Sequence, residues 1–217
     1  MIRHRIYTSV ALAVLVGSAA IAFVAESEAA LLSENPVVGK PAPAFTVSDT
    51  KGKTHSLGSY RGKWVVLEWF NHDCPYTRKH YFTNNMQNLQ RDYTGKGVVW
   101  ISVVSSAPGT QGYLASAADA DRAMVDRKAS PSFIVRDTAG TLGRLYAART
   151  TPHLYVIDPE GVLRYAGAID NKPSPSPSEV PTAHNYLKAA LDAGLAGKPI
   201  AVGTTQPYGC DVKYSGN

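Results

Sequence analysis

The sequence is poor in cysteine and in clustered charge. Only two cysteines, Cys74 and Cys210, occur among its 217 residues. Two are too few for a disulfide scaffold, so the domain must be held together by its hydrophobic core. The formal net charge of +5 is spread along the chain without a block of lysine or arginine. This distribution does not favour a nucleic-acid partner.

A long apolar run occurs only near the N-terminus. Residues 6–25 carry no charge, and they follow the basic residues 3–5. Small residues at 27 and 29 fit a cleavage site before Ala30, so residues 1–29 are predicted to be a signal peptide. The alternative is an uncleaved N-terminal anchor, because about 20 apolar residues span a bilayer. Since the run is rich in alanine, we expect cleavage and export to the periplasm or the cell exterior.

The rest of the chain alternates between strand and helix patterns. Residues 63–70 and 97–105 predict buried strands, and a predicted helix over 76–93 joins them into a parallel βαβ unit. Further helices are predicted over 110–129, 141–148 and 182–193, with a strand at 133–135 and a β-hairpin over 154–166. We therefore predict an α/β domain over 30–196 and a C-terminal tail over 197–217.

Cys74 stands where the first buried strand gives way to a helix. Pro75 follows it, and proline is favoured in the first turn of a helix. A cysteine at a helix N-terminus is stabilised as a thiolate by the helix dipole and by free backbone N–H groups. Such a thiolate is a nucleophile near neutral pH. The alternative is that Cys74 is an inert core cysteine or one half of a structural disulfide.

The order of elements, with Thr151-Pro152 just before the hairpin, resembles the thioredoxin fold. More closely, it resembles the exported thioredoxin-like redoxins of the AhpC/TSA type. The residues that carry the resemblance are GKPAPAF at 39–45, DTKG at 49–52, YRGKWVVL at 60–67, and VIDPEG at 156–161. The resemblance implies a central mixed β-sheet flanked by helices.

The resemblance also implies roles for individual residues. Cys74 corresponds to the attacking cysteine, and Pro152 to the cis-proline beside it, whose preceding residue, Thr151, pairs with substrate. Glu68, six residues before Cys74, corresponds to a buried carboxylate that can relay protons to sulfur. Alternatively, Pro152 is an ordinary proline at a strand start, and Glu68 is an edge residue or part of an ion pair.

The sequence departs from the thioredoxin pattern after Cys74. Thr77 replaces the second cysteine of Cys-x-x-Cys; its hydroxyl can donate to a thiolate at the substrate site but cannot resolve a mixed disulfide. We therefore expect Cys210 of the tail to be the resolving cysteine. Cys210 could instead form a permanent disulfide, or stay free while Cys74 acts with a small thiol. The charge of Asp73 opposes thiolate formation, whereas a protonated His72 would favour it.

These observations predict an exported thiol-disulfide oxidoreductase that acts on protein or small-molecule disulfides and thiols, with an unidentified reductant. A thiol peroxidase is an alternative, but the peroxide-activating set is incomplete because Asn71 and Pro152 occupy its hydroxyl and arginine positions; Arg149 could compete for the second. A binding module held by a Cys74–Cys210 disulfide is the non-enzymatic alternative. The histidines show no metal-ligand spacing, and no metal or cofactor is expected.

Overall fold

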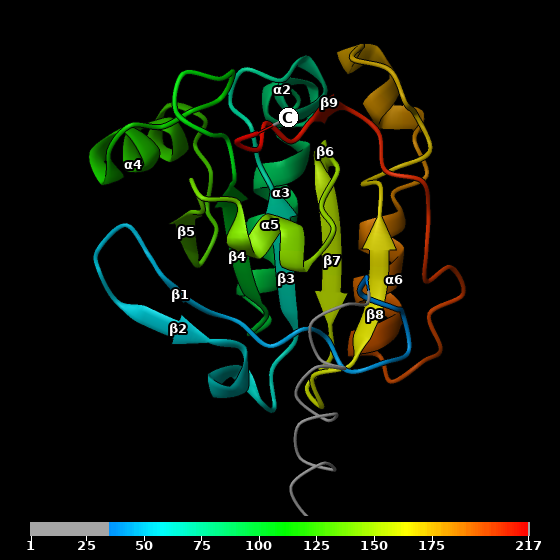
Figure 1. The fold of residues 1–217 in the computed structure, drawn as a ribbon. Helices are drawn as coiled ribbons and strands as arrows, with labels where there is room; N and C mark the ends of the chain where they lie inside the picture. Colours follow the sequence, from blue (N-terminus) through cyan, green and yellow to red (C-terminus); the bar gives the residue numbers. More distant parts are fainter. Residues whose placement is uncertain (1–34, 217) are drawn as a thin grey trace, which may run out of the picture. The chain divides into compact units, whose positions relative to one another are not determined.

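A computed structural model describes residues 35–216 of the chain. Its centre is a five-stranded mixed β-sheet with the strand order β5-β4-β3-β7-β8 (Figure 1). The strands are β3 (Val65–Trp69), β4 (Val99–Val104), β5 (Phe133–Arg136), β7 (His153–Ile157) and β8 (Leu163–Gly167). Strands β3, β4 and β5 run parallel, while β7 is antiparallel to β3 and to β8. The predicted α/β fold with a mixed sheet is confirmed.

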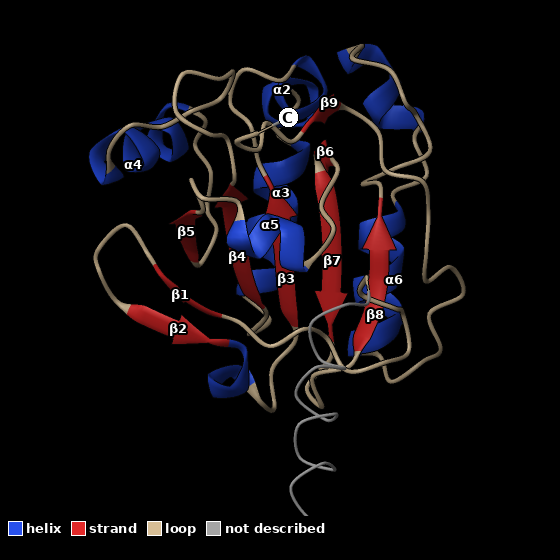
Figure 2. Ribbon diagram, viewed as in Figure 1, coloured by secondary structure: helices blue, strands red, loops and turns tan. Residues whose placement is uncertain are grey.

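Short strands and helices surround this sheet (Figure 2). The helices are α2 (Pro75–Phe82), α3 (Asn85–Thr94), α4 (Ala117–Asp126), α5 (Thr141–Leu145) and α6 (Tyr186–Leu195), with 3-10 turns η2 (Leu57–Tyr60) and η3 (Pro177–Thr182). Two small two-stranded sheets pair β1 (Thr46–Ser48) with β2 (Thr54–Ser56), and β6 (Thr150–Thr151) with β9 (Cys210–Asp211).

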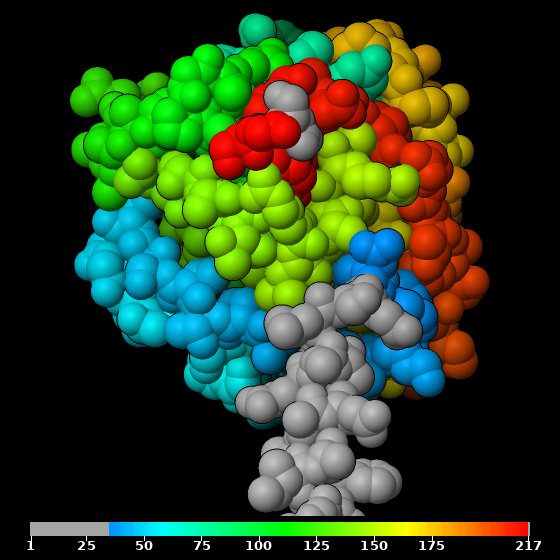
Figure 3. Space-filling model, in the orientation of Figure 1, coloured from blue at the N-terminus to red at the C-terminus, as the bar shows by residue number. Residues whose placement is uncertain are grey.

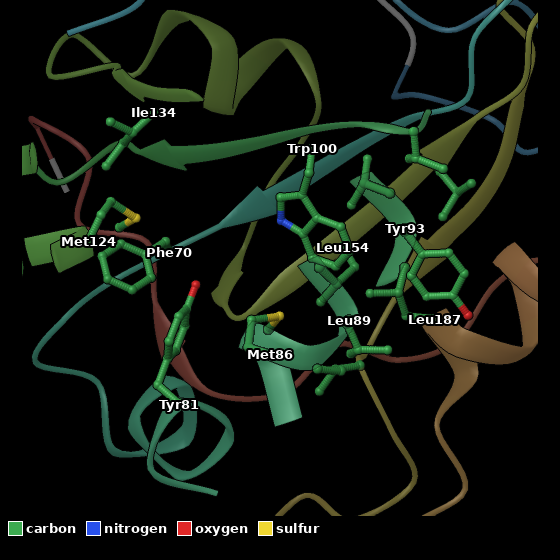
Figure 4. Close-up of a cluster of buried hydrophobic side chains, with 14 of the residues drawn as sticks. Phe70, Tyr81, Met86, Leu89, Tyr93, Trp100, Met124, Ile134, Leu154 and Leu187 are labelled. Carbon is green, nitrogen blue, oxygen red and sulfur yellow. The ribbon is translucent and has the colours of Figure 1, made fainter. Parts of the chain in front are cut away.

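The sheet buries both of its faces, because alternate residues of a strand point to opposite sides. On one face, residues of β3, β4 and β7 pack with α3, α4 and α6. Figure 4 shows this cluster, in which Trp100 of β4 and Leu154 of β7 lie near Met86 and Leu89 of α3. On the other face, α5, the N-terminal segment and Val212 of the tail cover the sheet. The core expected from the low cysteine content is therefore present.

The helix predicted over 76–93 is two helices in the structure. Asn84 breaks it by adopting a left-handed conformation, with φ of 57°. Asparagine is one of the few non-glycine residues that enter this region readily. The break separates α2, which begins directly after Cys74 at the end of the central strand β3, from α3, which packs on one face of the sheet.

The helix predicted over 110–129 begins later, at Ala117. The Ser116 hydroxyl oxygen accepts from the Asp119 N–H, and the Asp119 carboxylate accepts from the Ser116 N–H, which completes a capping box. The preceding residues form a loop in which Gly112 has a φ of 81° and its N–H donates to Asp73. The prediction was wrong for residues 110–116, because a turn at Gly112 interrupts the segment whose composition had suggested a continuous helix.

The predicted signal peptide over residues 1–29 lies outside the described residues. Within residues 35–216, none of the helices combines the length and apolar character needed to cross a bilayer. The tail over 197–216 folds back onto the domain, and its Val212 is buried in the second core cluster.

Candidate active site

Cys74 lies directly before α2, at the end of the sheet where β3 finishes. Asn71 bends the intervening turn, since its side chain accepts a hydrogen bond from the Asp73 N–H at 2.9 Å. Cys74 is the N-cap residue, and Pro75 is the first residue of the helix. The predicted position at a helix N-terminus is confirmed, so the sulfur lies at the positive end of the helix dipole.

The Thr151-Pro152 peptide bond lies beside this sulfur and is cis, as the resemblance to the thioredoxin fold implies. The Cys74 thiol donates to the Thr151 carbonyl oxygen at 3.1 Å. The contact follows from the sheet register, because His153, the first residue of β7, pairs with Trp69 at the end of β3. The two segments meet although 77 residues separate Cys74 from Thr151 in sequence.

The tail adds the second cysteine to the same place. Strand β9 pairs antiparallel with β6, with Cys210 opposite Thr151, and Figure 1 shows β9 running between α2 and β6. The Cys210 N–H donates to the Cys74 sulfur at 3.4 Å, and the Thr151 hydroxyl donates to the Cys210 carbonyl at 3.3 Å. Both cysteines are free thiols. The structure therefore brings together Cys74, Cys210, Thr151 and Pro152.

Gly209 permits this close approach of the tail. Its φ is 135°, and a Cβ atom there would lie 2.0 Å from the Thr151 carbonyl oxygen. A side chain at position 209 would therefore push β9 away from β6. The structure makes Gly209 a requirement of the site that the sequence analysis did not identify.

The two thiols differ in acidity. Burial raises the pKa of Cys74, but hydrogen bonds from the Cys210 and Thr151 side chains and from the backbone N–H groups of Thr77 and Cys210 outweigh it, so the net pKa is lowered. Burial and the hydrogen bond to Cys74 raise the pKa of Cys210 to about 12. Cys74 is therefore the more acidic thiol of the pair.

The more acidic thiol, Cys74, is also the less exposed of the two. Cys74 is 0% exposed, whereas Cys210 is only partly buried. In Figure 3 the tail, coloured red, lies over the segment that contains residue 150. The Cys210 N–H of the tail contacts the Cys74 sulfur, so the tail lies directly against the buried thiol.

Comparison with known proteins identifies the family. The sequence pattern of the AhpC/TSA family matches residues 38–166, more than half of the chain. The chain belongs to the AhpC/TSA family. These proteins are thioredoxin-like redoxins, and membership supports a general thiol-disulfide oxidoreductase activity. No curated protein matches the sequence.

Solved structures with the same fold cover most of this AhpC/TSA chain. A hypothetical protein from Sinorhizobium meliloti 1021 is 19% identical with a TM-score of 0.67, and the match covers 85% of this chain and 98% of that one. An uncharacterized conserved protein from Geobacillus kaustophilus is 21% identical with a TM-score of 0.65, covering 83% and 94%. A Bacteroides thetaiotaomicron protein, proposed to be a protein disulfide isomerase, is 18% identical with a TM-score of 0.51, covering 75% and 94%.

Glu68 of this AhpC/TSA member is completely buried among four donors. Its carboxylate accepts hydrogen bonds from Tyr81, Gln90, Trp100 and Ser102 at 2.7 to 3.0 Å. Burial raises its pKa, and the hydrogen bonds only partly oppose this. None of the hydrogen bonds found within residues 35–216 joins Glu68 to either cysteine. Glu68 is not an edge residue, because β3 is the central strand, and none of the ion pairs within the described range includes it.

The neighbours of Cys74 differ in part from expectation. Thr77 is buried, and its hydroxyl finds no hydrogen-bond partner in the described part of the chain; its backbone N–H supports the sulfur instead. Burial lowers the pKa of His72 against the opposing charge of Asp73. The imidazole is therefore less readily protonated, so the positive charge that was expected on His72 to stabilise a Cys74 thiolate is not favoured.

Other residues considered from the sequence contribute less. The Arg149 side chain is exposed, and Asn71 uses its side chain to hold the turn before Cys74. Among residues 35–216, no three histidine, cysteine or acidic side chains are grouped to hold a metal ion. Phe82 is 81% exposed beside Arg78 in a groove along α2.

Proposed function

We propose that this AhpC/TSA protein is a thiol-disulfide oxidoreductase in which Cys74 is the nucleophile and Cys210 the resolving cysteine. The observation that carries the proposal is the contact of Cys210 with the Cys74 sulfur, combined with opposite pKa shifts of the two thiols. A thiolate attacks a disulfide far faster than a thiol does. The difference in acidity therefore assigns the first attack to Cys74.

The exchange balances in two steps. The Cys74 thiolate attacks one sulfur of a substrate disulfide, forms a mixed disulfide and releases the other substrate sulfur. Cys210 then gives up its proton and attacks the Cys74 sulfur, which releases the second substrate sulfur and forms a Cys74–Cys210 disulfide. Cys74 loses one proton when it ionises and Cys210 loses the other, so two electrons pass from the protein to the substrate and the two released sulfurs each take up a proton. An external thiol reductant returns them.

Three further residues are proposed to contact the substrate sulfur, and a fourth is proposed to relay protons. Thr151 and Pro152 form the surface against which the substrate sulfur lies during the mixed disulfide. Thr77 contributes a buried hydroxyl without a partner, which is available to donate to that sulfur. Glu68, whose pKa burial raises, is proposed as a proton relay behind the site.

The test is the reaction of the reduced mature protein with oxidised glutathione and with a disulfide-bonded peptide. We expect exchange that rises with pH through the lowered pKa of Cys74 and that is lost in Cys74→Ser. Ser116→Ala, remote from both cysteines in sequence, is the control for handling and purity. Exchange that is unchanged in Cys74→Ser would refute the proposal.

The alternatives give different results in the same preparation. A thiol peroxidase would consume hydrogen peroxide much faster than free cysteine does. A disulfide-held binding module would keep a Cys74–Cys210 bond that millimolar dithiothreitol cannot reduce in the folded state. The proposed oxidoreductase consumes peroxide no faster than free cysteine, and dithiothreitol reduces its disulfide.

We also propose export, on the basis of the basic start and apolar run within residues 1–29. Mass mapping of the N-terminus of the protein recovered from its native compartment tests this. We expect a chain that begins at Ala30, and a chain that begins at Met1 would favour the anchored alternative.

A further inference from the structure

Tyr208 lies two residues before Cys210 and contacts a buried charged cluster that the exchange reaction does not use. The cluster consists of Lys79 and His80 of α2 and Asp170 after β8, and each of these residues is at most 2% exposed. The Lys79 ammonium and the His80 ring each lie 3.9 Å from the Asp170 carboxylate. The Tyr208 hydroxyl donates to that carboxylate.

Three residues of α2 contact Tyr208 directly. Its ring packs edge-to-face on Tyr76 with centroids 5.9 Å apart, and the Lys79 ammonium lies 5.0 Å from its ring centroid. His80 Nε2 lies 3.4 Å from its hydroxyl oxygen. Tyr208 is therefore held by the same helix that carries Cys74 at its first turn.

A single residue, Gly209, separates this anchor from Cys210. A tail thiol is a useful resolving group only if it is presented to Cys74 at a high effective concentration. The buried Asp170 carboxylate anchors Tyr208, because removing a hydrogen-bond donor from a buried carboxylate costs free energy.

We propose that Tyr208 is a positioning residue that holds Cys210 against Cys74, and that its bond to Asp170 sets the effective concentration of the Cys210 thiol. This inference rests on the proposed exchange between the two cysteines. When the bond breaks, β9 leaves β6 more often, so Cys74 is reached from solution more often and closes onto Cys210 less often.

The test compares Tyr208→Phe with wild type in the full mature protein. The control is Tyr93→Phe, since the Tyr93 hydroxyl also donates to a carboxylate, that of Asp192 at 2.8 Å, but lies between α3 and α6. The first readout is the equilibrium of the Cys74–Cys210 disulfide with dithiothreitol. The second is the rate at which iodoacetamide alkylates Cys74 in the reduced protein.

In Tyr208→Phe we expect the effective concentration of Cys210 to fall about tenfold and Cys74 alkylation to rise about tenfold, because one hydrogen bond to a buried charge is lost. Tyr93→Phe should leave both unchanged. Equal values in Tyr208→Phe and wild type, or equal changes in both variants, would overturn the inference. If wild type forms no such disulfide, the proposed resolving step fails, and alkylation alone then decides whether Tyr208 positions the tail.

Discussion

At the scale of single residues, the site is a pair of unequal thiols. The Cys210 side chain donates toward Cys74 and lowers its pKa, while the same contact raises the pKa of Cys210. One proton is thus kept on Cys210 so that Cys74 can ionise. The hydrogen bonds at the sulfur therefore more than offset the burial of Cys74, which is 0% exposed and would otherwise have a raised pKa.

Cys210→Ala should raise the pKa of Cys74 relative to Cys210→Ser. Serine keeps a donor beside the sulfur and alanine does not, while neither can form a disulfide. The pH dependence of thiolate absorbance in the ultraviolet measures this difference. The same Cys74 pKa in both variants would show that the Cys210 side chain does not support the thiolate.

Glu68 should make the free energy of unfolding depend on pH. Its folded pKa is raised, so the folded state binds more protons than the unfolded state between the two pKa values, and stability falls as pH rises through that interval. Glu68→Gln removes this dependence. Denaturant unfolding of both proteins from acid to neutral pH should show the wild type losing stability relative to the variant, and parallel curves would contradict the raised pKa.

The same substitution tests the relay proposed for Glu68. Gln cannot carry a proton but keeps a similar shape, so a relay predicts slower exchange with a changed pH profile. If exchange is unaltered while stability shifts as described, Glu68 is a buried structural acid.

Sequence spacing identified some of these residues and missed others for a physical reason. Cys74 and Glu68 lie six residues apart in one strand-helix unit, so the local sequence was sufficient to identify them. Pro152 was identified from its place in the order of elements that resembles the thioredoxin fold. Tyr208 and Asp170 gain their roles from contacts 38 residues apart. No local sequence pattern marks such a contact.

At the scale of elements, the two-residue strand β9 decides access to the site. It covers Cys74 by pairing with β6, and the pairing requires the missing side chain of Gly209. From the sequence, residues 197–217 are predicted only as a C-terminal tail, because they show no strand pattern and a two-residue strand is too short to produce one.

Gly209→Ala should displace β9 and expose Cys74. Its control is Gly216→Ala in the same tail, because Gly216 also has a positive φ, of 86°, but a Cβ there meets nothing within 4 Å. Both variants carry a backbone cost of about 1 kcal/mol, but only the first carries the clash.

Alkylation of Cys74 by iodoacetamide is the measurement. We expect an increase of about tenfold or more in Gly209→Ala, because the ladder hydrogen bonds of β9 are lost, and little change in Gly216→Ala. Similar rates in both variants would mean that β9 does not limit access.

At the scale of the whole molecule, the fold joins two cysteines that are 136 residues apart in sequence. The mixed sheet places the end of β3 next to the start of β7, and the second core cluster holds Val212 of the tail. The sheet was predictable from alternating strands and helices. The return of the tail to that edge was not, because it depends on packing between distant segments.

The central claim is that Cys74 attacks first and Cys210 resolves. Brief reaction of the reduced protein with oxidised glutathione, followed by acid quenching and mass mapping, tests it most directly. We predict a Cys74–Cys210 disulfide in wild type and a trapped glutathione on Cys74 in Cys210→Ser. Glutathione that remains on wild-type Cys74, or that is found on Cys210 in the reduced protein's first turnover, would contradict this account.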